Sequence, residues 1–167
     1  MDQAGDINNI WSATGQVPAV GKDIVRLDVD SFHHEAFAID DDTFLTLSSS
    51  LIEVDDFTTS ETDPDSPTET ANVVADVIVE FDREGNIKNQ IHLGDILDTI
   101  RICYDSLNHF WDALYSQAEG GTRDWGYANA VIYDSRDNTI IIVSLRHQDA
   151  VTKLRRSGEI NLDPMCG

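Results

Sequence analysis

The stretch AVIYDSRDNTIIIVSL, residues 130–145, decides the fold that this sequence predicts. It contains a short apolar run (130–133), a polar turn (134–138) and the β-branched run TIIIVSL (139–145). A run of β-branched residues that is apolar on both faces is typical of a strand inside a sheet or between two sheets. A compact polar turn between two such runs closes a hairpin. The stretch therefore predicts two antiparallel strands.

The same order of parts occurs twice along the chain, in residues 23–93 and in residues 124–162. Each segment contains a short strand, an acidic turn, an apolar strand and a further pair of strands around a glycine-containing turn. DVIVEFDREGNI (76–87) in the first segment corresponds to AVTKLRRSGEI (150–160) in the second. A four-stranded unit that recurs with inserted loops is typical of propeller blades. We therefore predict a mainly β fold of antiparallel four-stranded blades, about two of them, with open outer strand edges.

Two segments interrupt the strand pattern of this partial propeller, which we expect to span residues 1–167. Residues 58–72 (TTSETDPDSPTETAN) are rich in Thr, Pro and acids and predict an exposed acidic loop. Between Ile96 and Tyr115 apolar residues recur with a helical period, after Asp95 as an N-cap. The apolar positions are 96, 97, 100, 103, 107, 110, 111 and 114. This pattern predicts a helical insertion over 95–116.

The charge balance excludes several classes of partner. Eleven basic and 31 acidic residues give a formal net charge of −20, which argues against binding of nucleic acid or of an anionic membrane. Such an excess is also found as a solubility adaptation to salt. The first twenty residues resemble no secretory signal, and no apolar run suggests a membrane span. Neither the spacing of Cys103 and Cys166 nor any motif predicts a metal site or a cofactor, and a disulfide between the two cysteines stays open.

Three features could carry chemistry, and each also has a purely structural interpretation. His33 and His34 begin a predicted strand and are either loop histidines or donors facing a site. They are not expected to share a metal ion, because adjacent strand side chains point to opposite faces. Arg146 ends the apolar strand and is either a surface charge or a binder of oxyanions; His147 is expected to point the other way. DWGYAN (124–129) is either a packed loop or part of the same site.

The longer stretch from DWGYAN to GEI, residues 124–160, closely resembles the bacterial arylsulfotransferases that need no nucleotide sulfate donor. That family shows D-W-x-H-x-N, a strand, an acidic turn, an apolar strand, S-x-R-H-Q-x-A-V and a G-E-I hairpin. FHHE (32–35) is similar to the H-H-D blade start of the family. DVIVEFDREGNI (76–87) and GDILD (94–98) resemble the segment before its helical insertion. The acidic loop has no counterpart.

The resemblance implies a six-bladed β-propeller that transfers a sulfuryl group from an aryl sulfate to a phenol through a sulfated histidine, without a cofactor. By position, Arg146 and Asn129 would bind the sulfuryl oxygens. His34, with His33 as second candidate, would donate a hydrogen bond or protonate the departing phenolate. Tyr127 replaces a histidine of the family; its phenol holds its proton near neutral pH, so it donates a hydrogen bond but shuttles protons poorly. We therefore take His34 and Tyr127 as catalytic candidates, and Asn129, Arg146 and His33 as substrate-binding candidates.

One element of the family is not found in this chain. Its nucleophilic histidine lies in a later blade, beyond the match to residues 158–160, and residues 162–167 contain no histidine. His92 and His109 lie in the wrong context, a predicted outer strand and the predicted helix. We therefore expect an arylsulfotransferase fragment that is inactive alone. The alternatives are a non-catalytic propeller-type module that binds an anionic aromatic ligand, and a free-standing β-rich interaction domain.

The expected partners follow from the same resemblance. They are a small aryl sulfate and a phenol, with self-association of the chain through its open strand edges as a further expectation. Family members act in the periplasm or outside the cell, and we expect the same location here although the chain shows no signal peptide.

Overall fold

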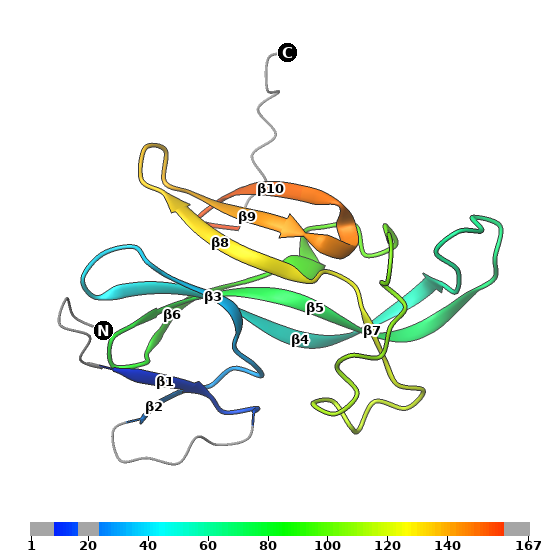
Figure 1. Cartoon of the computed structure of the whole chain (residues 1–167), viewed down its shortest axis with the longest axis horizontal. Coiled ribbons are helices and arrows are strands. Elements are labelled where there is room, and N and C mark those ends of the chain that lie inside the picture. Colours follow the sequence, from blue (N-terminus) through cyan, green and yellow to red (C-terminus); the bar gives the residue numbers. More distant parts are fainter. Residues whose placement is uncertain (1–8, 17–23, 159–167) are drawn as a thin grey trace.

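The computed structural model describes residues 9–16 and 24–158, which form a mainly β protein of three sheets without an α-helix in those ranges (Figure 1). In the first sheet, two short parallel strands pair: β1 (Ile10–Ala13) and β2 (Ile24–Leu27). The large sheet has the antiparallel order β3 (His33–Ala38), β4 (Thr43–Thr58), β5 (Thr68–Asp82) and β6 (Ile87–His92), and β7 (Thr122–Asp124) pairs parallel with β5. The third sheet is antiparallel and consists of β8 (Ala128–Asp134), β9 (Thr139–Leu145) and β10 (Ala150–Arg155). Two 3-10 turns are η1 (Leu93–Asp95) and η2 (Arg146–Gln148).

Strand β5 is central because both of its faces are covered. Val77, Val79 and Phe81 pack with β1 and β2 on one face. Ile78 faces the third sheet, and so does Asp76, whose carboxyl contacts β8. Side chains alternate between the two faces of a strand, so a strand buried on both faces reads as an almost continuous apolar run. Asp76 lies within this run, so its ionisable side chain is buried inside the protein.

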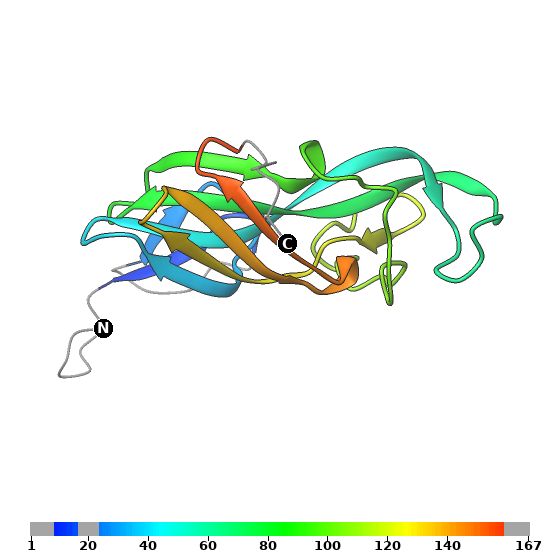
Figure 2. The ribbon, with the colours of Figure 1, turned by 90° about the horizontal axis from the view of Figure 1, so that it is seen from above.

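The main core lies between the large sheet and the third sheet (Figures 1 and 2). Its fully buried large side chains include Leu45, Leu47, Phe57, Ile78, Leu93, Trp125, Ile140 and Leu154. Burial of each such side chain stabilises the fold by roughly 1.5–3 kcal/mol. The third sheet is thus held on the large sheet by a continuous apolar interface, and this fixes the position of β8 relative to β3.

The two predicted hairpins around acidic turns are confirmed. In the first, the Asp42 N–H donates to Oδ1 of Asp40 at 2.9 Å, and β3 pairs antiparallel with β4. In the second, β8 pairs antiparallel with β9. The last predicted strand, 159–162, lies outside the described residues. The second repeat is therefore seen as three strands, and the large sheet contains the four strands β3 to β6 of the first.

The predicted helical insertion over 95–116 is wrong, because the segment is a series of turns (Figure 1). Polar side chains take the backbone donors that a helix needs: Asp98 accepts the Ile100 N–H at 3.0 Å, and Asn108 accepts the Phe110 N–H at 2.8 Å. Such local bonds compete with helix formation. The apolar positions were nevertheless informative, since three of them pack on the main core, namely Ile96, Leu97 and Leu107; Ile102, which did not fit the period, packs there as well.

The acidic loop is shorter than predicted. Strand β4 continues to Thr58 and β5 begins at Thr68, so the loop comprises residues 59–67. Phe57 is fully buried, and the Thr70 hydroxyl donates to Oδ1 of Asp55 at 3.0 Å across the two strands. These contacts allow the polar ends of the strands to pair.

Two further findings concern membranes and thiols. Within the described ranges, no helix has the length and apolar character needed to cross a membrane. Cys103 is a free, partly buried thiol, and Cys166 lies outside the described residues.

Candidate functional site

The candidate site lies where the start of β3 meets the start of β8. Arg146, the first residue of η2, follows β9 directly, and its N–H donates to the Tyr127 carbonyl at 3.2 Å. The next residues of η2 hold the same segment: the His147 N–H donates to the Gly126 carbonyl at 3.3 Å, and the Gln148 amide donates to the Trp125 carbonyl at 2.8 Å. Residues 125–127 are therefore tied to the end of β9 by three hydrogen bonds.

Four of the five predicted site residues form one chain of contacts around Tyr127. The His34 ring lies 5.2 Å from the Tyr127 ring, edge to face, and the Arg146 guanidinium lies 5.5 Å from the ring centroid. The latter distance is that of a cation–π contact. The His33 ring lies 5.4 Å from the His34 ring. Asn129 lies two residues after Tyr127 in β8 and is half-buried.

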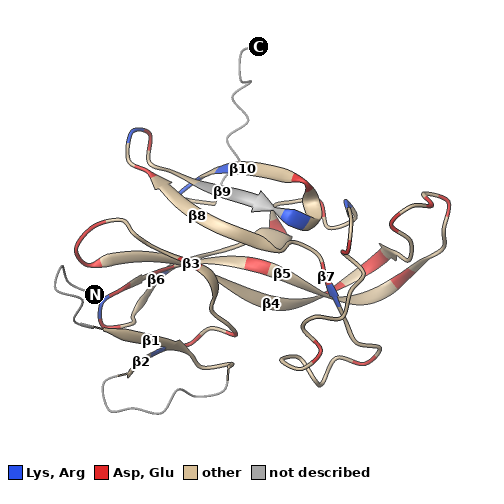
Figure 3. Cartoon of the chain, in the orientation of Figure 1, with Lys and Arg blue, Asp and Glu red and all other residues tan. Residues whose placement is uncertain are grey.

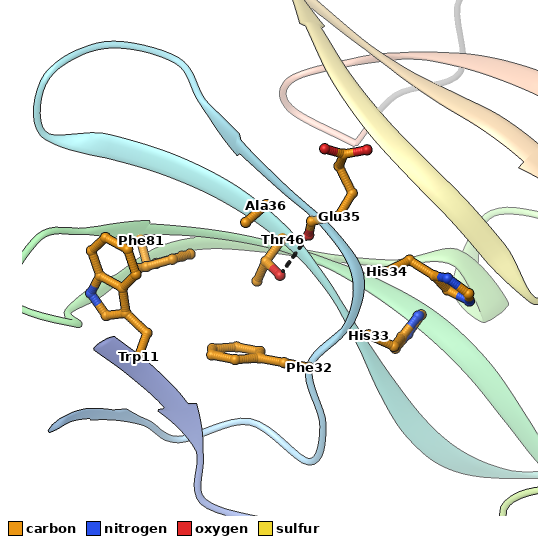
Figure 4. A pocket seen from close by; sticks show the side chains of 8 residues that line it. All are labelled: Trp11, Phe32, His33, His34, Glu35, Ala36, Thr46 and Phe81. Atoms are coloured by element: carbon orange, nitrogen blue, oxygen red, sulfur yellow. Dashed lines mark hydrogen bonds between the residues drawn. The ribbon is translucent and has the colours of Figure 1, made fainter. Parts of the chain in front are cut away.

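His34 and Tyr127 share an unusual backbone conformation. Their φ angles are 57° and 53°, in the left-handed region that residues other than glycine rarely adopt. A residue held there costs on the order of 1–3 kcal/mol and is common at functional sites. The register of β3 against β4 also shifts between His33 and Ala36. As a result, both imidazoles turn to the same side of β3, contrary to the alternation expected of adjacent strand residues (Figure 4).

His33 is half-buried and has a defined tautomer. Its Nε2 lies 3.0 Å from the Ser48 carbonyl oxygen. Because a carbonyl only accepts hydrogen bonds, Nε2 carries the proton and Nδ1 keeps its lone pair. Burial lowers the pKa of His33 from 6.5 to about 4, against the opposing effect of the Ser48 bond, and the neighbouring His34 lowers it further. His33 is therefore neutral at physiological pH.

Asp76 lies behind His33 and β8. Its Oδ1 accepts the Ala128 N–H at 3.1 Å and lies 3.5 Å from Nε2 of His33. Burial raises the pKa of Asp76 from 3.8 to about 7; the Ala128 bond opposes this shift and the nearby Asp124 adds to it. The His33–Asp76 distance is that of an ion pair, yet the Nε2 proton is shared with Ser48 and burial disfavours both charges. The pair is therefore neutral at pH values below the one at which Asp76 ionises.

Sequence reasoning missed two aromatic residues that contact the predicted ones. Trp111 lies 5.6 Å from the His33 ring and donates from Nε1 to Oδ1 of Asp124 at 2.9 Å, and Phe110 lies 6.5 Å from Tyr127. The two aromatic residues belong to the segment read as a helix, so their pattern gave no indication of a site.

His147 was expected to point away from Arg146, but both residues contact Tyr127. The His147 ring lies 5.0 Å from that of Tyr127, and its Nδ1 donates to the Asp124 carbonyl at 2.6 Å. The alternation ends because η2, a 3-10 turn, replaces the strand at this point.

A separate cavity of about 270 Å³ lies on the other side of β3. Trp11, Phe32 and Phe81 line it together with residues 33–36 and Thr46. Figure 4 shows these three aromatic rings on one side of the β3 ribbon and the two imidazoles on the other. His33 and His34 themselves line the cavity, while their rings turn away from the three aromatic rings.

The guanidinium of Arg146 is an exposed positive charge in a protein with a large excess of negative charge. Basic residues are few and scattered, whereas acidic residues occur in the large sheet, in the third sheet and in the loops (Figure 3). Arg146 is exposed while it contacts Tyr127, so its fork is accessible to an anion. Within the described ranges, no three His, Cys, Asp or Glu side chains are arranged to hold a metal ion.

The site thus combines an accessible guanidinium, two imidazoles, a phenol and further aromatic rings. The sequence matches the family model described as Arylsulfotransferase (ASST) over residues 9–162, nearly the whole chain. A comparison with curated proteins found no match. The chain therefore belongs to the arylsulfotransferase family.

Proposed function

We propose that this chain provides the aryl-sulfate-binding part of an arylsulfotransferase. The observation that carries the proposal is the contact chain of His33, His34, Tyr127 and Arg146. A guanidinium presents parallel donors to the oxygens of a sulfate, and aromatic rings beside it offer a surface for the aryl group. The large negative charge of the chain makes an accessible cation at this position a specific attraction for an anion.

The roles follow from what each side chain can donate. Arg146 and the amide of Asn129 bind the sulfuryl oxygens, and the Tyr127 hydroxyl donates a hydrogen bond to the same group. In the family reaction the bond between sulfur and the aryl oxygen breaks while sulfur bonds to a histidine nitrogen. His34 gives the departing phenolate its proton. The bond between sulfur and the histidine nitrogen then breaks as sulfur bonds to the oxygen of an acceptor phenol, and the proton of that phenol passes to His34.

We further propose that the large sheet and the third sheet are neighbouring blades of a propeller. They pack face to face over one core, as blades do. β3 and β8 are the first strands of the two units, and they begin beside each other with the site residues at their starts. First strands of blades line the axial channel, so this arrangement would place the site there. Their open edges would favour self-association of the isolated chain.

The 167-residue chain is proposed to bind an aryl sulfate without turning it over. Of its five histidines, His92 ends β6 and His109 contacts Arg123 and Asp112, whereas His147 is buried with Nδ1 bonded to the backbone. None of these matches the family nucleophile, which follows the residues corresponding to 158–160. The assay is release of 4-nitrophenol from 4-nitrophenyl sulfate with phenol as acceptor; steady turnover above background would refute this proposal.

Binding is tested separately from turnover. We expect 4-nitrophenyl sulfate to bind the purified chain and Arg146→Ala to weaken binding by about tenfold or more, as for a lost charged hydrogen bond. Arg136→Ala is the matched control, since it removes the same charge from an exposed β8–β9 turn where Arg136 pairs with Asp134. Equal losses in both variants would show general charge attraction rather than a site.

A second candidate function is a binding module without chemistry. Tyr127 favours it, because this phenol replaces the family histidine and contacts His34, Arg146 and His147 as a packed aromatic centre. Assays on the longest protein product of the gene discriminate between the two candidate functions. Turnover by a product that carries further blades supports the transferase, and binding without turnover by that product supports the module.

A further inference from the structure

Asp76 lies directly beneath the segment that presents Tyr127. It is almost fully buried in β5, and its Oδ1 accepts the N–H of Ala128, the residue after Tyr127. Its Oδ2 is buried and has no hydrogen-bond partner within the part of the chain described. A charged carboxylate oxygen in this position would be costly, whereas a protonated acid loses only a neutral hydrogen bond.

Gly126 provides an independent sign that this contact shapes the segment. A Cβ added at Gly126 would lie 2.0 Å from Oδ2 of Asp76. The glycine is not among those with positive φ, so its backbone conformation is open to alanine. It is the carboxyl of Asp76, and not the turn itself, that excludes a side chain at this position.

The groups around the carboxyl determine where its proton lies. His33 faces it from β3, Asp124 from β7 and the Ala128 N–H from β8. In water, near pH 5, the proton of a His–Asp pair resides on the imidazole. Here burial raises the pKa of Asp76 to about 7 and lowers that of His33 to about 4, so the proton resides on the carboxyl. Oδ1 already accepts a hydrogen bond, which leaves Oδ2 as the oxygen that carries the proton.

We propose that Asp76 is the positioning residue of the site: as an uncharged acid it holds the Gly126–Ala128 segment that presents Tyr127, and it leaves His33 neutral. This inference rests on the proposed function, because the predicted effect of Asp76 is on the binding of an aryl sulfate. When Asp76 loses its proton, a buried negative charge lies behind the site and opposes sulfate binding. Aryl sulfate binding therefore weakens as the pH rises through the value at which Asp76 ionises.

The first test compares binding of 4-nitrophenyl sulfate at pH 6 and pH 8.5. Between these pH values we expect binding by the wild type to weaken by roughly tenfold more than binding by Asp76→Asn. This is the order of magnitude of the repulsion between two like charges near a protein surface. Asparagine still accepts the Ala128 N–H but cannot ionise, and other titrating groups act equally in both proteins. Asp76→Ala loses the acceptor and binds weakly at both pH values. Glu80→Gln, which alters another buried acid of β5, keeps the pH response of the wild type.

The outcomes separate this inference from the proposed function. Equal pH dependence of wild type and Asp76→Asn overturns the role of Asp76. Absence of binding by the wild type at both pH values overturns the proposed function, and the carboxyl is then followed without ligand by ¹³C NMR. A midpoint near 7 supports the neutral acid, and a midpoint near 4 overturns it.

The second test is a double-mutant cycle, which does not depend on the ionisation of Asp76. Gly126→Ala places a methyl group against Oδ2, so it weakens binding in the wild type but not further in the Asp76→Ala background. Additive losses in the double variant would show that the two residues do not act through each other.

Discussion

The location of the proton shared by His33 and Asp76 can be read from the stability of Asp76→Asn at different pH values. In the unfolded chain the two groups titrate near 6.5 and 3.8, and in the folded chain near 4 and near 7 with their order exchanged. The pair thus holds one proton over nearly the same pH range in both states. Stability depends on pH only through the difference in bound protons, so the wild-type pair contributes almost no pH dependence.

Substitution of either His33 or Asp76 reveals the pH dependence of stability that the remaining group contributes. In Asp76→Asn only His33 titrates, with a folded pKa near 4 that lies below the unfolded value of 6.5. The unfolded state then binds more protons between these values, so the free energy of unfolding rises with pH, by roughly 3 kcal/mol. In His33→Gln only the raised pKa of Asp76 remains, and the free energy of unfolding falls by roughly 4 kcal/mol between pH 4 and pH 7.

The measurement is urea denaturation followed by tryptophan fluorescence at half-unit steps between pH 4 and pH 7.5. The readout is the slope of the unfolding free energy against pH, which a general loss of packing does not change. Val79→Ala, which removes buried apolar atoms of β5 and no titratable group, is the control and should lower the curve without altering its shape. Parallel curves for wild type, Asp76→Asn and His33→Gln would refute the reasoning, since the proton would then not have moved between the two groups.

Three further predictions concern single contacts. Arg156→Ala leaves the buried Glu80 carboxylate without its guanidinium partner. The free energy of unfolding, measured by urea denaturation, should fall by about 2–4 kcal/mol. A loss below about 1 kcal/mol would show that the carboxylate becomes solvated in the variant. Tyr115→Phe removes a hydroxyl that donates to Asp30 at 2.9 Å and should cost about 1–2 kcal/mol in the same assay, and an unchanged midpoint would contradict that bond. Tyr127→Phe keeps the ring contacts but loses the hydroxyl. Calorimetric titration should show that the variant binds 4-nitrophenyl sulfate about threefold to tenfold more weakly, at unchanged stability. Unchanged affinity would exclude the proposed hydrogen bond.

The strand pattern was available in the sequence because it depends on local rules. The β-branched run 139–145 and the acidic turn before it predicted a hairpin, which β8 and β9 form. The residues that meet around Tyr127 were named from the resemblance of FHHE, DWGYAN and SLRHQ to one family, and their roles stay a prediction. The helical period over 95–116 failed for a local reason as well, since Asp98 and Asn108 take backbone donors that a helix would use.

The role of Asp76 could be found only in the tertiary structure. The sequence places it at the start of an apolar strand, and period-two alternation determines which residues share its face. Alternation does not reveal what lies opposite that face. His33 and Gly126 are 43 and 50 positions away along the chain, and packing brings both to the same carboxyl. The energy of a buried charge depends on which groups surround it in space, so the protonation of this site is decided by the fold and not by the order of its residues.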